Sequence, residues 1–147
     1  MTLSSRRVTI HTDGGARGNP GPAAAAFVIR DAADGKTLLE GGVFLGEATN
    51  NVAEYRGLIA GLQAAQKIGA TSVEVISDSE LLVQQMTGAY RVKNAGLRPL
   101  YETAVQLRET FKRFSIRHVR REQNKDADRL VNEAIDRRQN VEDVADV

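Results

Sequence analysis

Four carboxylates stand at points where the folding pattern does not require an acid: Asp13, Glu54, Asp78 and Asp128. Asp13 and Asp78 each end a β-branched apolar run. Glu54 lies about 85° from the centre of its helix's apolar stripe, at ~100° per residue, and Asp128 also lies at the margin of such a stripe. Each has an ordinary explanation as well: a turn residue for Asp13, a helix cap for Asp78, a first-turn glutamate for Glu54 and a boundary acid for Asp128.

Taken together, the four acids predict a cation site. If the runs that end at Asp13 and Asp78 are parallel neighbours, these two acids meet on adjacent strands, and the two helical acids lean over them. Clustered carboxylates raise one another's pKa values unless a cation neutralises them. Hard oxygen ligands without cysteine favour Mg²⁺ or Mn²⁺. Two such ions about 4 Å apart clamp the attacking water and the leaving oxygen of a phosphodiester.

The elements that must position these acids follow from apolar periodicity. Alternation predicts strands over 6–13, 23–31, 37–46, 72–78 and 114–120, and helical spacing predicts helices over 49–70, 79–86, about 99–114 and 125–138. Hairpins first and strand–helix alternation later indicate an α/β fold. We expect a five-stranded mixed sheet with three antiparallel strands first, then parallel ones, and helices on both faces. The first strand should be central, with the fourth parallel beside it. Gly57 and Gly61 in the long helix indicate close helix–sheet approach.

Length and composition suit one domain of 147 residues. We expect an N-terminal tail over 1–7, the domain over 8–138 and a frayed acidic tail over 139–147. Residues 90–121 carry nine Lys/Arg against two Glu, a net +7, which leaves −6 for the rest of a chain of net charge +1. This asymmetry suits a polyanion held beside a metal site, although a solvated helix face explains it equally well. The chain has no cysteine, no apolar leader and no membrane-spanning stretch. These features predict a soluble, cytoplasmic protein without membrane association, and we expect a monomer.

The sequence also resembles a known family, type 1 ribonuclease H, in its compact form with a reduced basic handle, as in archaeal and some bacterial enzymes. The matching stretches are TDGGARGNPGP, TNNVAEY, ISDS, YRVKN with LRPLY, and REQNKDADRLVNEA, from about Val8 to Arg138. The resemblance implies the ribonuclease H-like fold, with Asp13, Glu54, Asp78 and Asp128 as catalytic and metal-binding residues. It implies hydrolysis of the RNA strand of RNA–DNA hybrids with two Mg²⁺, for which Mn²⁺ can substitute. The products carry 5′-phosphate and 3′-hydroxyl ends. Double-stranded RNA is a further candidate substrate.

The same resemblance assigns substrate contacts to the glycine loop and to the start of the first long helix. Gly14 and Gly15 would let backbone N–H groups approach the shallow minor groove of the hybrid. Three asparagines resemble groove-reading positions, because an amide both donates to and accepts from a 2′-hydroxyl: Asn19, Asn50 and Asn51. Helix capping is the alternative for Asn50. Ser79 occupies a position near the substrate path.

The two histidines and two arginines near the last strand need separate interpretation. His118 lies ten residues before Asp128, a spacing that matches a histidine on a loop in many relatives. We interpret His118 as a strand residue without a catalytic role, and Arg120 or Arg121 as candidate auxiliary residues at the mouth of the site. His11 is interpreted as a packed strand histidine.

The basic handle of the family is reduced to YRVKNAGLRP, so substrate grip must rest on Arg91, Lys93, Arg98 and arginines at the sheet edge. Weaker affinity and stronger salt sensitivity should follow. Two alternatives stay open: a nucleic-acid-binding module of the same fold without catalysis, and a nuclease of the same superfold acting on DNA. The four carboxylates disfavour the first, and the paired asparagines with the glycine loop disfavour the second.

Overall fold

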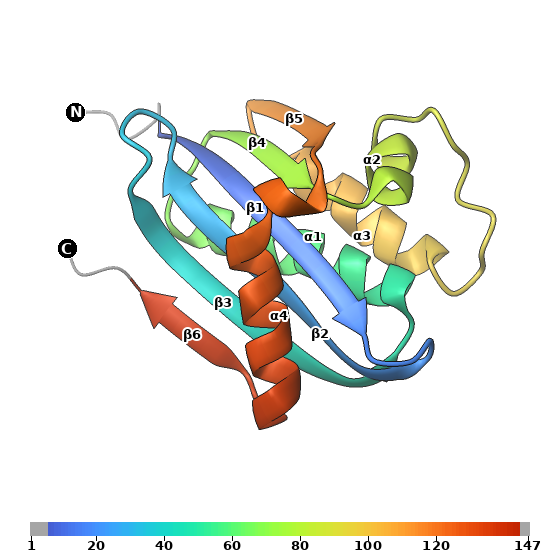
Figure 1. Cartoon of the computed structure of the whole chain (residues 1–147). Coiled ribbons are helices and arrows are strands. Elements are labelled where there is room, and N and C mark those ends of the chain that lie inside the picture. The colour runs from blue at the N-terminus through green and yellow to red at the C-terminus, as the bar shows by residue number, and fades with distance from the viewer. Residues whose placement is uncertain (1–5, 145–147) are drawn as a thin grey trace.

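A computed structural model describes residues 6–144 of the chain and shows a mixed sheet with helices on both faces (Figure 1). The strands are β1 (Arg7–Ala16), β2 (Gly21–Asp31), β3 (Thr37–Ala48), β4 (Ser72–Ser77), β5 (Arg113–His118) and β6 (Val141–Val144). The helices are α1 (Asn50–Lys67), α2 (Glu80–Met86), α3 (Arg98–Arg108) and α4 (Lys125–Arg137), with a 3₁₀ turn at Arg121–Gln123 before α4. No helix within the described residues is long and apolar enough to cross a bilayer.

The sheet has the strand order β5-β4-β1-β2-β3-β6. β1, β2 and β3 are antiparallel neighbours, whereas β4 runs parallel to β1 and β5 parallel to β4. This confirms the expected interior first strand with the fourth strand parallel beside it. Thr12 of β1 is opposite Ser77 of β4, so Asp13 and Asp78 follow at the same end of two neighbouring strands.

The expectation of five strands is wrong, because β6 adds a sixth at the edge. Val141–Val144 pairs antiparallel with Leu39–Gly42 of β3, where a frayed tail was expected. The polar composition of this segment gave no strand signal, but the free edge of β3 offers unpaired backbone groups to any segment that returns there. Asn140 helps to direct the return, because its Oδ1 accepts the Phe44 N–H at 2.9 Å. The expected tails otherwise fall mainly on 1–5 and 145–147, outside the described residues.

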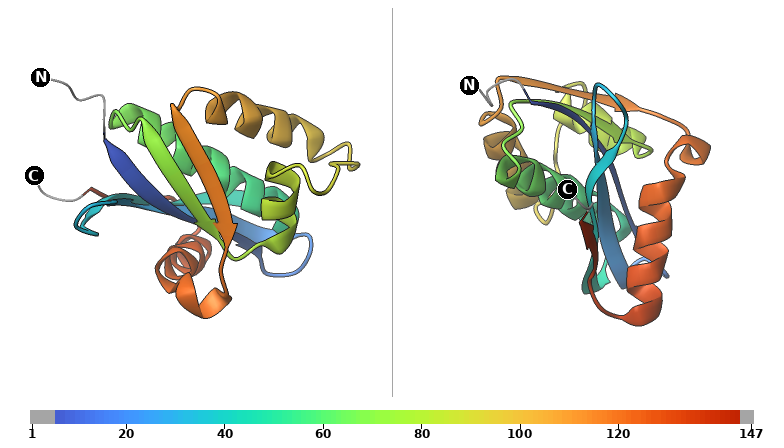
Figure 2. Two further views of the ribbon diagram at one scale, coloured as in Figure 1. Left: turned by 90° about the horizontal axis from the view of Figure 1, so that it is seen from above. Right: turned by 90° about the vertical axis from the view of Figure 1, so that its left-hand side faces the viewer.

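The two faces of the sheet are covered unequally. α1 and α3 lie on one face and α4 alone lies on the other, as the right-hand view of Figure 2 shows. Glycines let α1 approach the sheet closely: a Cβ on Gly57 would lie 2.4 Å from the Asp13 carbonyl oxygen, and one on Gly14 would lie 2.2 Å from the Ala53 backbone. A Cβ on Gly61 would lie 2.9 Å from the Ile10 side chain. The predicted close approach is therefore confirmed, and it brings the first turns of α1 against β1.

Local signals explain where the helices begin and end. Thr49 caps α1 by accepting the Val52 N–H, and Gly69, with φ of +79°, follows its last turn. α3 begins with Pro99 in its first turn and ends at Arg108, earlier than predicted. The residues after Arg108 turn the chain back to β5, which lies beside β4.

Candidate active site

Three of the four predicted acids converge where β1 and β4 end beside α1. One carboxylate oxygen from each of Asp13, Glu54 and Asp78 lies within 4.8 Å of the others. Asp13 comes from within β1, which continues to Ala16, and only 5% of its surface is exposed. Its Oδ1 accepts the Gly14 N–H at 2.9 Å. The backbone contact between α1 and β1 is what brings Glu54 to Asp13.

The ordinary explanations of Asp78 and Glu54 do not hold in the structure. Ser79, not Asp78, caps α2, since its Oγ accepts the Leu82 N–H at 3.2 Å. The Asp78 carboxylate is thus left free of a capping role. Glu54 is not an exposed first-turn glutamate, because its Oε1 is buried and has no hydrogen-bond partner within residues 6–144. Both side chains instead face Asp13.

The fourth acid, Asp128, comes from α4, on the other face of the sheet (Figure 2). It lies in the first turn of α4 and lines a cavity of about 360 Å³ together with Asp13, Glu54 and Arg121. It does not belong to the tight cluster of the other three acids. Asn132, one turn later, donates to the Asp128 carbonyl oxygen at 3.1 Å and approaches its Oδ2 at 3.5 Å. Asp128 therefore lines the same cavity as Asp13 and Glu54 but lies outside the tight cluster.

Burial and mutual repulsion perturb the three clustered acids. Burial, followed by the charge of Asp78, raises the pKa of Asp13 to about 8. Burial, followed by the charges of Asp13 and Asp78, raises the pKa of Glu54 well above its usual value. The pKa of Asp78 is also raised, chiefly by burial, against the lowering effects of Asp13 as a hydrogen-bond donor and of the Arg121 charge. Without a cation, Asp13 therefore keeps its proton near neutral pH.

This donor set fits a divalent metal ion. None of the four acids forms an ion pair within the described residues, and the buried Oε1 of Glu54 lacks a partner. Carboxylate oxygens without sulfur or a paired histidine suit Mg²⁺ or Mn²⁺. A bound cation would favour the charged carboxylates and so offset both the burial and the repulsion that raise the three pKa values.

The asparagines expected to contact substrate also connect the glycine loop to α1. Asn19 Oδ1 accepts the Asn50 N–H at 3.0 Å, and Asn50 Oδ1 accepts the Ala16 N–H at 2.8 Å. Because Thr49 caps the helix, Asn50 is not its cap, and the side-chain NH₂ groups of Asn19 and Asn50 remain for a ligand. Asn51 is exposed. Their roles as substrate contacts stay a prediction.

The glycine loop has two different reasons for its small residues. Gly14 is required by α1, whose backbone would overlap a Cβ there. At Gly15, which lines the cavity, a Cβ would meet only the Val131 side chain, at an ordinary 3.8 Å. Helix packing therefore accounts for Gly14, whereas at Gly15 packing does not require glycine, and its predicted contact with the groove stays a prediction.

Of the two candidate arginines, only Arg121 lines the cavity with the acids. Arg120 is exposed at the start of the 3₁₀ turn. His118 is the last residue of β5, opposite Ser77 and exposed, so its predicted place in a strand is confirmed, and its lack of a catalytic role stays a prediction. His11 is a partly buried strand residue whose pKa is lowered by burial and then by Arg30.

Sequence reasoning missed two residues, Asn124 and Arg17, that tie α4 to the rest of the site. Asn124 is buried directly before α4, and its Nδ2 donates to the Thr12 carbonyl oxygen at 2.8 Å. Arg17 bonds Asp136 at 2.6 Å and Asn132 at 3.2 Å, so the glycine loop also holds α4. An asparagine before a helix reads as a cap, and that ordinary signal concealed its long-range contact.

Comparisons with known proteins identify the family of the chain. The family model described as "Reverse transcriptase-like" matches residues 11–134. Ribonuclease H of Nitrobacter hamburgensis is 32% identical over 142 residues, which cover 87% of this chain and 91% of that protein. The chain belongs to the type 1 ribonuclease H family. Ribonuclease HI of Halobacterium salinarum is 45% identical over 130 residues, 88% of this chain and 65% of that protein. The "Bifunctional protein Rv2228c" of Mycobacterium tuberculosis is 49% identical, but the chain spans only about a third of it, 36% of its length.

Solved structures of ribonucleases H share the fold. RNase H1 from Halobacterium salinarum superposes with a TM-score of 0.86 over 89% of this chain and 98% of that one, at 45% identity. The N-terminal RNase H domain of rv2228c from Mycobacterium tuberculosis gives 0.88 at 49% identity, over 90% and 96% of the two chains. LC11-RNase H1, solved in complex with an RNA/DNA hybrid, gives 0.85 at 46% identity, over 89% and 98%.

Proposed function

We propose that this protein is an endoribonuclease that hydrolyses the RNA strand of RNA–DNA hybrids and leaves 5′-phosphate and 3′-hydroxyl ends. The observation that carries the proposal is the convergence of Asp13, Glu54 and Asp78, with Asp128 across the same cavity, in a chain of the ribonuclease H family. The hybrid bound by the 46%-identical LC11 enzyme supports the choice of substrate.

We assign Asp13, Glu54, Asp78 and Asp128 as the residues that hold two Mg²⁺, for which Mn²⁺ can substitute. When bound, such ions polarise the scissile phosphate and favour deprotonation of the attacking water. The chain's own residues prepare the site for this chemistry. Buried Asp13 and Glu54 keep carboxylates at a point with little bulk water, and the charge of Arg121 acts on Glu54 and Asp78. Arg121 would also attract the phosphate at the mouth of the cavity.

Recognition of the RNA strand would fall to the opposite rim. The amide NH₂ groups of Asn19 and Asn50, the exposed Asn51 and the backbone at Gly15 would contact 2′-hydroxyls, which the use of only the side-chain oxygens in the bonds of Asn19 and Asn50 supports. The Ser79 hydroxyl oxygen is engaged in capping α2, so Ser79 would contribute through its position near Asp78.

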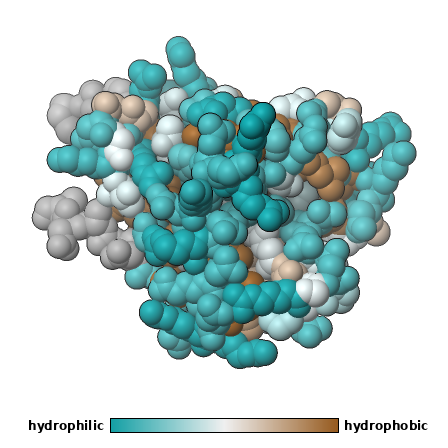
Figure 3. All heavy atoms as spheres, in the orientation of Figure 1, coloured by the Kyte–Doolittle hydropathy of each residue, from teal (hydrophilic) through white to brown (hydrophobic). Residues whose placement is uncertain are grey.

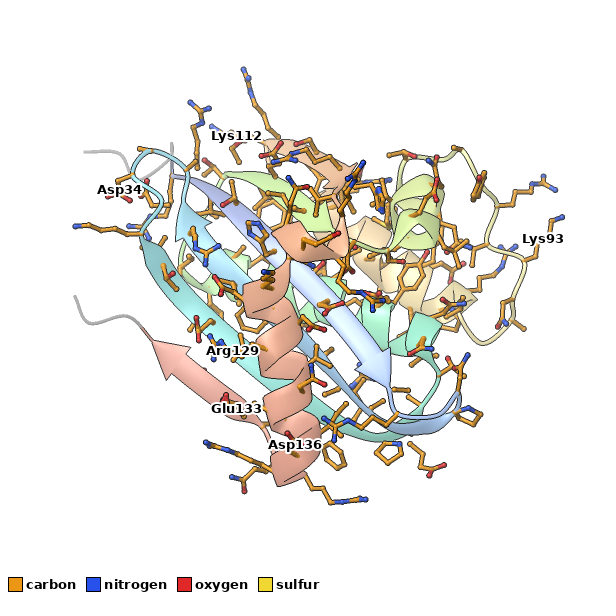
Figure 4. The ribbon with its side chains drawn as sticks, in the orientation of Figure 1. Asp34, Lys93, Lys112, Arg129, Glu133 and Asp136 are labelled. Atoms are coloured by element: carbon orange, nitrogen blue, oxygen red, sulfur yellow. The ribbon has the colours of Figure 1, made fainter. Side chains whose placement is uncertain are left out.

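Contacts to the phosphates of the nucleic acid would come from the loop between α2 and α3. Arg91 and Lys93 are exposed there, and Lys93 extends away from the body of the molecule (Figure 4). Phosphate contacts of this kind position the duplex and make binding dependent on salt.

We further propose that the protein acts as a monomer in the cytoplasm. Double-stranded RNA would be a second, weaker substrate.

A digest of one labelled RNA strand tests this function. The strand is presented as an RNA–DNA hybrid and as double-stranded RNA, with an all-DNA duplex of the same sequence as control, in Mg²⁺. We expect rapid cutting of the hybrid and no cutting of DNA. Binding of hybrid without cutting would establish the non-catalytic module instead, and cutting of the all-DNA duplex would establish a DNA nuclease.

A further inference from the structure

A buried asparagine outside the acid set joins the two elements that carry Asp13 and Asp128. Asn124 has only 1% of its surface exposed, and its side chain reaches from the start of α4 to β1. Its Nδ2 donates at 2.8 Å to the carbonyl oxygen of Thr12, the residue before Asp13. Its own carbonyl oxygen accepts the Asp128 N–H at 3.2 Å. One residue thus contacts both walls of the cavity through two hydrogen bonds.

Asn124 does not behave as the helix cap that its position suggests. A capping asparagine accepts an N–H from the first turn with its side-chain oxygen, and Asn124 makes no such bond. Its Oδ1 is buried and has no partner within residues 6–144. An unpaired buried oxygen costs stability, so a residue that served only packing would do better without it. The useful part of the side chain is the donor that meets Thr12.

The Thr12 carbonyl is a fixed point in the molecule. Thr12 is fully buried, and it pairs with Phe27 on one side and with Ser77 on the other. Pairing between β1 and β4 ends there, one residue before Asp13 and Asp78. The hydrogen bond from Asn124 to this carbonyl therefore fixes the position of α4 relative to β1 and β4, the two strands that bring Asp13 and Asp78 to the site.

We propose that Asn124 is a positioning residue that sets the distance of Asp128 from the cluster of Asp13, Glu54 and Asp78. The proposal rests on the proposed function, since it concerns the cations that these acids would share. The first turn of α4 buries only Ala127, whereas Leu130, Val131 and Ile135 pack further along the helix, so apolar packing alone leaves the distance of the first turn from the sheet poorly determined. Without the amide, the first turn can shift away from β1 and take Asp128 with it.

Two substitutions at one position separate positioning from stability. Asn124→Leu keeps the approximate volume and removes both the donor and the unpaired oxygen, whereas Asn124→Ala also leaves a cavity. The Leu variant takes the amide donor from the Thr12 carbonyl oxygen but also removes the unpaired Oδ1, so these two effects offset each other and its thermal unfolding should be close to that of the wild type. Calorimetric titration with Mn²⁺ in the absence of nucleic acid should nevertheless show about tenfold weaker binding, corresponding to ~1.4 kcal/mol.

Turnover on hybrid should follow the same pattern. We expect kcat to fall at least tenfold in both variants at low Mg²⁺, with KM for the hybrid nearly unchanged and with part of the loss regained at high Mg²⁺. Val28→Ala is the matched control, because it removes a buried contact from the sheet face under α4 and leaves the amide intact. It should lower the unfolding temperature and leave the affinity for Mn²⁺ unchanged.

Wild-type affinity for Mn²⁺ in a folded Leu variant would overturn the proposal. So would failure of both Asn124 variants to fold, since Asn124 would then be a general requirement of the core. Failure of the proposed function is distinguishable: the wild type would then bind Mn²⁺ and cut no hybrid, while the comparison of Mn²⁺ affinities between wild type and variants would still decide the role of Asn124.

Discussion

The two faces of the sheet are packed differently. The candidate site takes Glu54 from the helix on one face and Asp128 from the helix on the other. On the α1 and α3 face, the core contains large buried side chains such as Tyr55, Leu58, Leu62 and Phe111. On the α4 face, the core consists of alanines with a few larger residues, mainly Leu130, Val131 and Ile135. Glu54 thus lies on a helix that packs against a large apolar core, whereas Asp128 lies on a helix with a smaller apolar contact.

Polar contacts replace apolar ones on the α4 face. Arg17 bonds Asp136 near the end of α4, and Arg30 forms an ion pair with Asp126 at its start. The outside of this face is mostly hydrophilic (Figure 3), and Figure 4 shows Arg129, Glu133 and Asp136 along the helix. Exposed pairs contribute about 0–1 kcal/mol each. The face with the larger apolar core, under α1 and α3, therefore fixes three of the acids. On the α4 face, which has fewer apolar contacts, the position of the fourth acid can be adjusted.

Asp13→Asn should have the largest effect, because it removes a charge from the rigid cluster. We expect hybrid cleavage to fall at least ~100-fold, several kcal/mol of barrier, with the fold retained. Single-turnover rates in Mg²⁺ measure the loss, and circular dichroism checks the fold. A variant that kept more than about a tenth of the rate would exclude Asp13 as a ligand of the catalytic ions.

Gly14→Ala and Gly15→Ala form a matched pair on neighbouring residues. The first places a Cβ 2.2 Å from the Ala53 backbone and forces α1 away from β1, whereas the second meets only the Val131 side chain at 3.8 Å. Overpacking of this severity should cost about 3 kcal/mol or more. Denaturant unfolding should show this loss for Gly14→Ala, and near wild-type stability with weaker hybrid binding for Gly15→Ala. Equal stability of the two variants would contradict the close approach that places Glu54.

Sequence patterns predicted the antiparallel first strands, the parallel pair of β1 and β4 and the close approach of α1, because apolar periodicity and helix glycines reflect local packing. They also predicted that Asp13 and Asp78 lie at the same end of two neighbouring strands. They could not reveal β6, whose pairing depends on a free strand edge rather than on its own composition. Nor could they show that Asn124 reaches Thr12, since its sequence position already had a sufficient local explanation as a cap.

Stability without metal should fall as pH rises, because the Asp13 carboxyl has a pKa of about 8 in the folded protein against 3.8 as its ordinary value. The folded state alone holds this proton between these two values, so its contribution is fully present below pH ~4 and is lost as pH rises through ~8. Asp13 contributes at most about 1.4 kcal/mol per pH unit to this slope, and the raised pKa values of Glu54 and Asp78 add to it with the same sign. Denaturant unfolding in chelator from pH 5 to 8 measures the slope. Asp13→Asn and saturating Mg²⁺ should each flatten it, and an equally steep slope in the Asn variant would place its origin elsewhere.

The smallest effect concerns the mouth of the cavity. Arg121→Ala should lower kcat on hybrid by about tenfold, since its charge acts on Glu54 and Asp78. His118→Ala should change kcat less than about twofold, because His118 ends an exposed edge strand. Steady-state kinetics with matched unfolding temperatures compare the two. A larger loss from the histidine change would reverse our assignment of the auxiliary group.

Anomalous diffraction from crystals grown with Mn²⁺ tests the central claim most directly. We predict a manganese peak in contact with the carboxylates of Asp13, Glu54 and Asp78, and a second ion toward Asp128 when hybrid is bound to an inactive variant. The same peak should be absent from Asp13→Asn crystals. A cluster without manganese at saturating Mn²⁺, with the ion bound elsewhere, would contradict the assignment of these acids as the metal site.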